Sequence, residues 1–407
     1  MTASTRAPSA PDAAPPGLGQ PLLAGALTAV VGVTSTFAVV LAGLQAVGAT
    51  PTQAASGLMV LCLVCGIGTF WLSRRHRMPV VLAWSTPGAA LLASSSGVEG
   101  GWSAAVGAFV LVGMLVLLTA LWPRLGELIG MIPTPVAQAM LAGVLLPLCL
   151  HAVTGLVDEP LLVLPVVLAW LVSMALFGRF ASPVAFLVAL VVMGVWIVDD
   201  GGLQGSLLPV VDVVAPTLSV QAVVGLAVPL YVVTMASQNV PGVAVLGSFG
   251  FTAPWRPLMA VTGLGTVVGA PFGGHAINLA AITAAISAGP EAGPDPSRRW
   301  WAGQSCGVTY LVLGVASTAI TVAATTAPVE VLLAVAGLAL MSTLAGALTG
   351  AMAQERFRVP AVTTFVVAAS GITLLGIGAA FWALVVGLVV AAVTGAFRAP
   401  VDPAPPK

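Results

Sequence analysis

Long apolar runs, separated by short clusters of Gly, Pro and charged residues, follow one another along almost the whole chain. A helix needs about 20 apolar residues to cross the hydrocarbon core of a bilayer. The pattern therefore predicts an all-α polytopic membrane protein with fourteen segments. Twelve are predicted as helices, at about 21–47, 51–72, 101–122, 132–150, 160–178, 182–198, 217–247, 257–270, 300–324, 328–352, 360–375 and 378–396. The third and tenth segments, 79–96 and 271–289, are irregular.

The composition supports this interpretation and excludes a soluble protein. Of the 407 residues, 59% are hydrophobic and 6% are charged, whereas about a quarter of the residues of an average soluble protein are charged. So few charges could not cover the surface of a soluble domain. The net charge of +0 provides no basic field for nucleic acid. The four cysteines are too few for a disulfide framework in a chain of this length.

The two ends of the chain differ from the apolar part between them. Residues 1–20 and 398–407 are rich in Ala and Pro, which predicts disordered tails. The first tail does not have the pattern of a signal peptide, because no charged region leads directly into a short apolar core. Between the tails we expect one membrane domain, made of a first repeat (21–198), an external loop (199–216) and a second repeat (217–397).

Charged residues are distributed unevenly between the predicted loops. If the N-terminus lies in the cytoplasm, all 13 basic residues fall on the inner side, as the positive-inside rule expects. The outer loops then carry only acids, among them Glu99, Asp158 and Asp199. One segment more or fewer would place every later basic cluster outside. The sequence therefore predicts two cytoplasmic termini, and it determines the parity of the crossings better than their number, since twelve crossings would also fit.

Weak internal similarity predicts two inverted repeats. Seven segments from an inner N-terminus end outside, so the next seven run in the opposite sense. Pro133 and Pro328 open the fifth and twelfth segments, and an Ala-Phe pair begins at Ala185 in the seventh and at Ala380 in the fourteenth. The offset is 195 residues in both cases (328 − 133 and 380 − 185). Inverted repeats are typical of secondary transporters.

The third segment contains an internal helix start. Residues 79–84 (PVVLAW) have an extended, partly β-branched pattern, and residues 85–88 (STPG) follow. A Ser or Thr hydroxyl ahead of Pro is a helix-start signal, with the hydroxyl as N-cap and Pro at the first helical position. We therefore expect a short strand and then a half-length helix from about residue 89 to residue 93.

The tenth segment is interrupted at the corresponding place. Residues 270–275 (APFGGH) break the chain, and we expect a helix to restart through Ala276, Asn278 and Ile282. Helices that begin within the membrane aim unpaired N–H groups and a positive dipole end into the interior, where two such ends can hold an anion without Arg or Lys. The alternative is that both breaks are loops or kinks that serve packing alone.

A few polar residues lie at membrane depth and are therefore candidates for function. Thr34 and Ser35 lie in the middle of the first segment, and Gln238 and Asn239 lie in the middle of the eighth. Such groups are costly in hydrocarbon unless they are paired or face a cavity, so contact between helices is their alternative role. His275 is the one ionisable side chain placed near the middle of the membrane. It is a candidate for function or, alternatively, a structural imidazole.

Three of these stretches resemble the signature segments of BenE-type benzoate/proton symporters. They are residues 83–90 (AWSTPGAA), 234–242 (TMASQNVPG) and 272–281 (FGGHAINLAA). The likeness extends from about residue 20 to residue 397. It implies an inner-membrane carrier of benzoate that is driven by proton symport.

The resemblance also implies kinship with the architecture of uracil and sulfate permeases. Those carriers have fourteen segments in two inverted sevens, a core and a gate domain, and short strands ahead of half-helices in segments 3 and 10. The acids that uracil permeases use in segments 8 and 10 have no match here, where Gln238, His275 and Asn278 stand nearby instead. This difference fits an anionic ligand and leaves the proton route open.

A substrate carboxylate is therefore expected between the predicted helix starts at 85–88 and 274–278. Trp84 would lie near the ring, and His275 would take part in carrying the proton, since its usual pKa near 6.5 suits exchange around neutral pH. The candidate binding residues are Trp84, Ser85, Thr86, Gly88, Thr34, Ser35, Gln238, Asn239, Gly274, His275 and Asn278.

Several functions remain as alternatives. A nucleobase carrier or an inorganic-anion carrier could use the same fold, and a membrane-embedded enzyme or a channel belongs to another class. An enzyme is disfavoured because the sequence has no triad-like set, metal-ligand cluster or nucleotide loop, and only three histidines. The expected partners are a small aromatic carboxylate, protons and the lipid bilayer, with no nucleic acid, cofactor or metal. The sequence leaves open which acid is carried and whether the protein is a homodimer.

Overall fold

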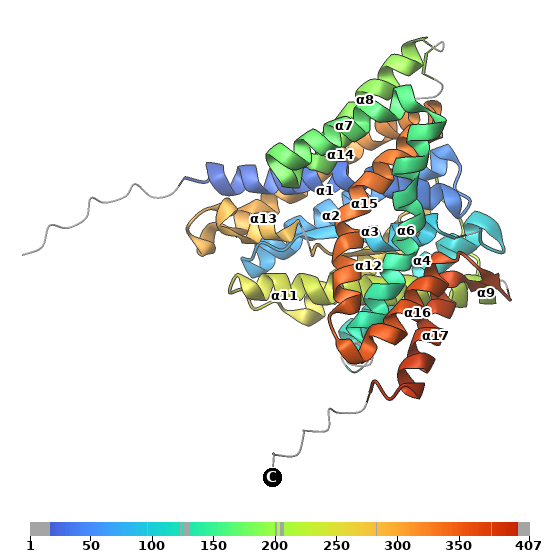
Figure 1. Ribbon diagram of the computed structural model, residues 1–407. Helices are drawn as coiled ribbons and strands as arrows, with labels where there is room; N and C mark the ends of the chain where they lie inside the picture. The colour runs from blue at the N-terminus through green and yellow to red at the C-terminus, as the bar shows by residue number, and fades with distance from the viewer. Residues whose placement is uncertain are drawn as a thin grey trace, which may run out of the picture.

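The fold is almost entirely helical (Figure 1). The computed structural model describes residues 17–95, 97–122, 124, 131–199, 202–203, 207–281, 283–375 and 377–397. Most of the predicted tails, 1–20 and 398–407, and part of the predicted loop 199–216 lie outside the described residues.

The helices follow the predicted segments closely. In the part of the chain that the structure describes, nine helical stretches are long and apolar enough to cross a membrane, which confirms an all-α polytopic membrane protein. The first of these helices are α1 (Gly19–Ala46), α2 (Pro51–His76), α4 (Gly101–Leu121), α6 (Thr134–Asp158), α7 (Pro160–Phe177) and α8 (Ala181–Asp199). The later ones are the eighth segment (Val220–Ser248), a stretch that contains α14 (Trp300–Thr326), and α15 (Val329–Met352). Three shorter helices, α12 (Trp255–Gly269), α16 (Arg358–Ala369) and α17 (Ala379–Val393), are not among the nine. Short 3-10 turns lie at η1 (Gly178–Phe180), η5 (Pro290–Ala292), η6 (Pro296–Arg298) and η7 (Glu355–Phe357).

The last two segments are shorter than predicted. Helix α16 has 12 residues and α17 has 15, which corresponds to about 18 Å and about 22 Å, less than the ~30 Å hydrocarbon core. The predicted helix 360–375 ends at Ala369, because Gly371 takes a left-handed conformation with φ of 64°. Two short strands, β3 (Thr373–Leu374) and β4 (Ile377–Gly378), pair there as an antiparallel hairpin.

The third segment has the predicted strand and half-helix. Strand β1 (Leu82–Trp84) leads into α3 (Thr86–Ala93). The hydroxyl of Ser85 accepts a hydrogen bond from the Gly88 N–H at 3.1 Å, and Pro87 lies in the first turn. The predicted hydroxyl cap is therefore present and belongs to Ser85, while Pro87 takes the second helical position rather than the predicted first.

The tenth segment has the short strand ahead of a short helix that the resemblance implied, but not the helix that the local pattern predicted from Ala276. After the 3-10 turn η4 (Ala270–Phe272), the chain does not restart as a helix at Ala276 but forms strand β2 (Ile277–Leu279). The helix α13 (Ala284–Ala288) begins later and has five residues. The physical reason is the antiparallel pairing of β2 with β1, which supplies the backbone hydrogen bonds that a helix would otherwise provide. Ile282, expected within the helix, lies outside the described residues.

The eighth segment is continuous in direction but not uniform. It consists of α9 (Val220–Ala222), the π-helix η2 (Val223–Ala227), α10 (Val228–Thr234), the π-helix η3 (Met235–Asn239) and α11 (Val240–Ser248). Pro229 and Pro241 are each the second residue after one of the two π-helices. A proline lacks the N–H for the helical hydrogen bond and its ring crowds the carbonyl four residues earlier, so each widened turn accommodates a proline. Such π-bulges occur often at functional sites.

Glycine contacts hold two helix pairs close together. Helix α2 packs on α14 and α4 packs on α12. A Cβ atom added to Gly66 would lie 2.8 Å from the Gly307 carbonyl oxygen, and one added to Gly113 would lie 2.9 Å from that of Gly263. Small residues allow such close crossings in membrane helices.

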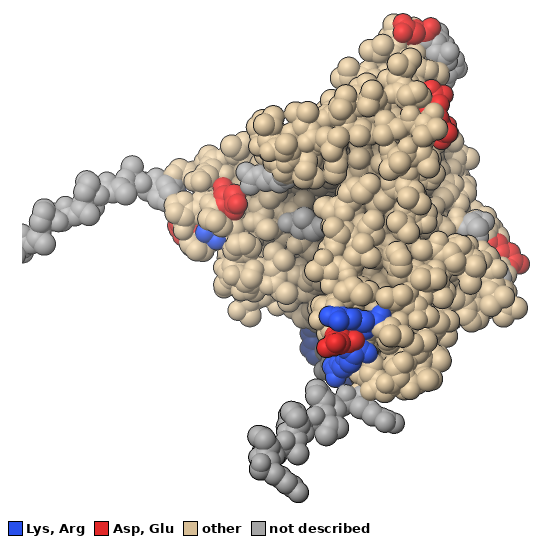
Figure 2. All heavy atoms as spheres, viewed as in Figure 1, with Lys and Arg blue, Asp and Glu red and all other residues tan. Residues whose placement is uncertain are grey.

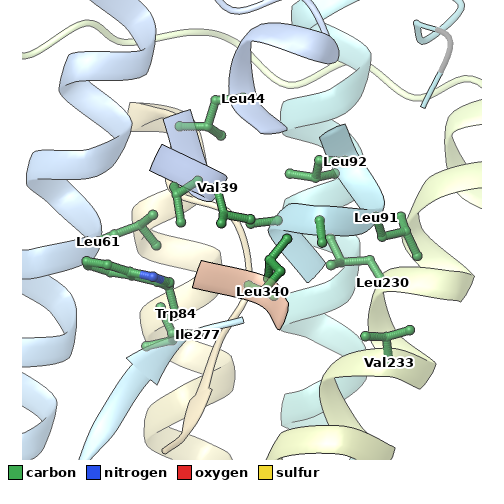
Figure 3. Close-up of a cluster of buried hydrophobic side chains, with 14 of the residues drawn as sticks. Val39, Leu44, Leu61, Trp84, Leu91, Leu92, Leu230, Val233, Ile277 and Leu340 are labelled. Carbon is green, nitrogen blue, oxygen red and sulfur yellow. The ribbon is translucent and has the colours of Figure 1, made fainter. Parts of the chain in front are cut away.

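The core of the molecule lies where the two strands meet the surrounding helices. Figure 3 shows Trp84 of β1 and Ile277 of β2 beside Leu61 of α2, while Leu91 of α3 faces Leu230 of α10. All five side chains are at most 3% exposed. The broken segments are thus enclosed by intact helices, as irregular backbone at membrane depth requires.

The register of the two strands agrees with the predicted repeat. Ala83 is the middle residue of β1 and pairs with Asn278, the middle residue of β2. These two residues are 195 positions apart (278 − 83), the same offset as between the similar sequence pairs. An antiparallel pair centred in this way is what a two-fold relation between the halves would produce, although the repeat itself stays a prediction.

Candidate functional site

A cavity of about 460 Å³ lies between two groups of helices. One wall comes from α1, the two broken segments, η3 and α14, and the other comes from α7, the start of α8 and α15. Figure 2 shows the surface hollowed between the α7–α8 pair and α15. The residues of the first wall are Val31, Gly32, Ser35, Thr36, Ala83, Trp84, Thr86, Pro87, Gln238, Ala280, Ala281, Thr283, Ile286 and Tyr310. Those of the second wall are Trp170, Met174, Gly178, Ala181, Ser182, Leu338, Ala339, Ser342 and Thr343.

The indole of Trp84 is held in a fixed orientation at this cavity. Its Nε1–H donates to the hydroxyl of Thr36 at 2.7 Å, and that hydroxyl donates to the Gly32 carbonyl at 2.8 Å. The ring of Tyr310 packs edge-on against the indole, with 6.2 Å between centroids. Because the polar edge of the indole is satisfied within the protein, the lining surface of Trp84 is apolar and suits an aromatic ring.

Four polar side chains of the first wall are free to bind a ligand. Ser35, Thr86, Gln238 and Thr283 line the cavity, and none of them has a hydrogen-bond partner among the described residues. The cavity therefore offers donors that the protein itself does not use.

No Asp, Glu, Lys, Arg or His is among the described residues that line the cavity. An anion would therefore be held by neutral donors rather than by a fixed positive charge. The half-helix α3 contributes to such a site, because its first residues, Thr86 and Pro87, lie at the cavity and the start of a helix carries partial positive charge.

The structure brings four of the predicted site residues to the cavity, namely Trp84, Ser35, Thr86 and Gln238. Thr34 does not line it, and its hydroxyl donates to the Val30 carbonyl at 2.7 Å.

Ser85 and Gly88 do not line the cavity but lie next to residues that do. The hydroxyl of Ser85 is fully buried and accepts hydrogen bonds from the Gly88 N–H and from the hydroxyl of Thr234. A Cβ atom on Gly88 would contact the side chain of Leu230. These groups fix the start of α3 against α10, so their geometry indicates support rather than contact with a ligand.

The two asparagines hold the strands together. The Asn239 Oδ1 accepts the N–H of Leu279 at 3.0 Å, and Asn239 is fully buried. With its amide oriented to match its surroundings, Asn278 donates to the Ala83 carbonyl. Neither residue lines the cavity, and their geometry ties η3 and β1 to β2.

Gly274 and His275 lie ahead of β2 rather than at a helix start, which corrects the expected helix N-terminus at 274–278. The Gly274 N–H donates to the Gly269 carbonyl. The imidazole of His275 is fully buried and packs edge-on against Phe109, with 6.4 Å between centroids. Neither of its nitrogens has a hydrogen-bond partner among the described residues, and His275 does not line the cavity.

The sequence did not point to the second wall of the cavity. Trp170, Met174, Ser182, Ser342 and Thr343 lie in segments that are apolar along most of their length. The adjacent hydroxyl residues Ser342 and Thr343, within the apolar span α15, are the sequence feature that could have indicated this wall.

Comparison with known proteins identifies the family of this chain. The family model of BenE, the benzoate membrane transport protein, matches residues 19–393. The chain belongs to the BenE family. It is 39% identical over 369 residues to the inner membrane protein YdcO of Escherichia coli (strain K12), covering 90% of this chain and 93% of that protein. It is 28% identical over 374 residues to the benzoate membrane transport protein of Acinetobacter baylyi (strain ATCC 33305 / BD413 / ADP1), with the same two coverages.

Solved structures of membrane transporters share the fold. The transmembrane domain of the cyanobacterial bicarbonate transporter BicA matches with a TM-score of 0.57 at 15% identity, covering 93% of this chain and 97% of that one. The structure of SLC26A9 matches with a TM-score of 0.60 at 16% identity, covering 93% of this chain and 65% of that one. At such identities the likeness shows the fold alone. As a member of the BenE family, the chain is a multi-pass membrane transporter and not an enzyme.

Proposed function

We propose that this BenE-family transporter imports benzoate or a related aromatic carboxylate together with protons across the bacterial inner membrane. The observation that carries the proposal is the cavity between two groups of helices, which combines aromatic walls with unused neutral donors. The name of the Acinetobacter relative, a benzoate membrane transport protein, supports the choice of substrate.

The wall residues suggest how the substrate is held. The ring lies against the apolar surfaces of Trp84 and Tyr310, and the carboxylate accepts hydrogen bonds from the hydroxyls of Ser35 and Thr86 and from the Gln238 amide. Hydrogen bonds to a charged group are stronger than those between neutral groups. A fixed Arg or Lys is therefore not required, and its absence from the described lining eases release of the anion on the other side.

Uptake into proteoliposomes tests the proposed function directly. The purified protein should take up radiolabelled benzoate with saturation, and an imposed pH gradient, acidic outside, should drive accumulation above the external concentration. A protonophore should abolish this accumulation. Labelled uracil and labelled bicarbonate are offered in parallel. If either of them is taken up and benzoate is not, the nucleobase or inorganic-anion alternative replaces the proposal.

The proposed coupling to protons assigns the proton to His275. Among the described residues, it is the only buried His, Asp or Glu, and an imidazole exchanges protons around neutral pH. Because His275 does not line the cavity, it would act through β2, which it precedes, rather than by contact with the substrate.

His275→Gln should still take up benzoate down its gradient but should lose accumulation against it, because glutamine cannot carry the proton. The rates of both processes are measured in proteoliposomes between pH 5.5 and 8, roughly centred on the usual imidazole pKa. His151→Gln, at an exposed histidine, is the control and should behave as the wild type. Accumulation by His275→Gln at the wild-type level would mean that the proton travels on the substrate or on water.

The proposed orientation places both termini in the cytoplasm. Figure 2 shows basic side chains at the lower end of the molecule, below α15 and α16, and at its left end near α13, in both places with acidic side chains beside them. The top and right ends of this face carry only acidic side chains among the described residues. This distribution supports an inner side at the lower left, as the positive-inside rule requires.

Thiol labelling of intact cells tests the orientation. A cysteine at Glu159 should react with an impermeant reagent from outside, and a cysteine at Arg75 should react only after the membrane is permeabilised. The background is low because the four native cysteines are buried. Labelling of Arg75→Cys but not Glu159→Cys in intact cells would reverse the proposed topology.

A further inference from the structure

The second wall of the cavity carries two hydroxyl groups that make no hydrogen bond to their own helix. Leu338, Ala339, Ser342 and Thr343 of α15 all line the cavity. Their spacing of four residues, 338 to 342 and 339 to 343, places them on one face of the helix. The hydroxyls of Ser342 and Thr343 therefore point in the direction in which α15 faces the two broken segments.

These two hydroxyls do not bond to their own helix. A hydroxyl in a membrane helix ordinarily donates to the carbonyl four residues earlier, as Thr349 of the same helix does to Ala345 at 2.9 Å. Thr28, Thr262 and Thr266 in other spans do the same. Ser342 and Thr343 have no such bond and no other hydrogen-bond partner among the described residues. Their donors and acceptors are thus available to whatever fills the cavity.

The cavity also has room beyond a single carboxylated ring. Its volume of about 460 Å³ falls within the roughly 300–1,000 Å³ of pockets that enclose drug-sized ligands. The proposed carboxylate donors, Ser35, Thr86 and Gln238, all belong to the first wall. A ring held there extends toward α15, where an unsubstituted edge would meet two polar groups without satisfying them.

We propose that Ser342 and Thr343 form a second polar subsite that binds a hydroxyl group on the ring, so that hydroxylated aromatic carboxylates are the preferred substrate class. This inference rests on the proposed function, since it assumes that an aromatic acid occupies the cavity. A phenolic hydroxyl can donate to one side-chain oxygen and accept from the other, which matches two adjacent serine and threonine hydroxyls.

The test compares substrates within one preparation. KM values for labelled benzoate, 3-hydroxybenzoate and 4-hydroxybenzoate are measured in proteoliposomes for the wild type and for the double variant Ser342→Ala/Thr343→Val. The ratio of the KM for the preferred hydroxybenzoate to the KM for benzoate should rise up to about tenfold in the double variant, because the loss of a hydrogen bond between neutral groups weakens affinity by up to about that factor. Thr349→Val, on the same helix but satisfied by its own backbone, is the matched control and should leave the ratio unchanged.

The outcomes separate this inference from the proposed function. One outcome is that the wild type takes up benzoate while, for both isomers, the ratio of the hydroxybenzoate KM to the benzoate KM is the same in the double variant as in the wild type. In that case the subsite is refuted and the proposed function stands. A rise of all three KM values by the same factor also refutes the subsite, because the two hydroxyls then act on the shared part of the substrates. If the wild type takes up none of the three acids, both proposals fall.

Discussion

Replacing Gln238 with leucine is expected to raise the KM for the transported carboxylate about tenfold to hundredfold. The Gln238 amide lines the cavity and has no hydrogen-bond partner among the described residues. Its N–H groups are therefore available for an anion in a cavity without described charged side chains. A hydrogen bond to a charged group contributes about 1.5–3 kcal/mol, which corresponds to that range of affinity. The size of leucine is similar, so the change removes the donor more than the volume.

The neighbouring residue provides the control for this experiment. The hydroxyl of Ser237 donates to the Val233 carbonyl at 2.6 Å and does not line the cavity, so Ser237→Ala should transport with the wild-type KM. Because Gln238 contributes no bond to the described structure, Gln238→Leu should also unfold at the same temperature as the wild type. An unchanged KM in a well-folded Gln238→Leu protein would remove this amide from the binding site.

The parts of the site that follow from local chemistry could be predicted from the sequence. Ser85, Thr86 and Pro87 specify a helix start by themselves, because the cap, the first-turn proline and the end of the strand all act within a few residues. For the same reason, the structure has the predicted strand and half-helix in the third segment.

The tenth segment could not be predicted in the same way. Ile277, Asn278 and Leu279 precede an alanine-rich stretch, and local propensity alone favours a helix through them. Their conformation is decided by β1, nearly two hundred residues earlier in the chain, whose backbone pairs with them. Tertiary pairing of this kind overrides local preference. The strand also determines which way His275 points, so an ionisable residue at the right depth need not face the cavity.

The second wall of the cavity was hidden for a different reason. Helices α7 and α15 are apolar nearly all round, since one face meets lipid and the other meets protein. The period of hydrophobic residues therefore does not reveal which face lines a cavity. Only the packing of α15 against α1 and α6 turns Ser342 and Thr343 inward, and that packing is not encoded in a local pattern.

Replacing Gly307 with leucine is expected to prevent α2 and α14 from packing and to leave little folded protein. A Cβ atom at this position would lie 2.7 Å from the Gly66 carbonyl oxygen and 2.9 Å from the Cβ atom of Phe70. Both atoms belong to a helix that cannot yield without separating from its neighbours. Overpacking in a tight core typically costs about 1–3 kcal/mol of stability and sometimes more. Because the leucine side chain would overlap backbone atoms of α2, its cost should be at least about 3 kcal/mol. The readouts are the thermal midpoint and the monodisperse fraction after extraction in detergent.

The same experiment on the other crossing tests the predicted repeat. Gly113 of α4 is the counterpart of Gly307 in the predicted repeat, 194 residues earlier (307 − 113), and its Cβ atom would lie 2.9 Å from the Gly263 carbonyl oxygen of α12. If the halves are structural equivalents, Gly113→Leu should lower the midpoint about as much as Gly307→Leu. Gly346→Leu is the control, because nothing lies within 4 Å of the added Cβ atom there, and it should fold normally. Tolerance of leucine at Gly113 but not at Gly307 would show that the two crossings differ in their tolerance of a side chain, which two equivalent repeats do not predict.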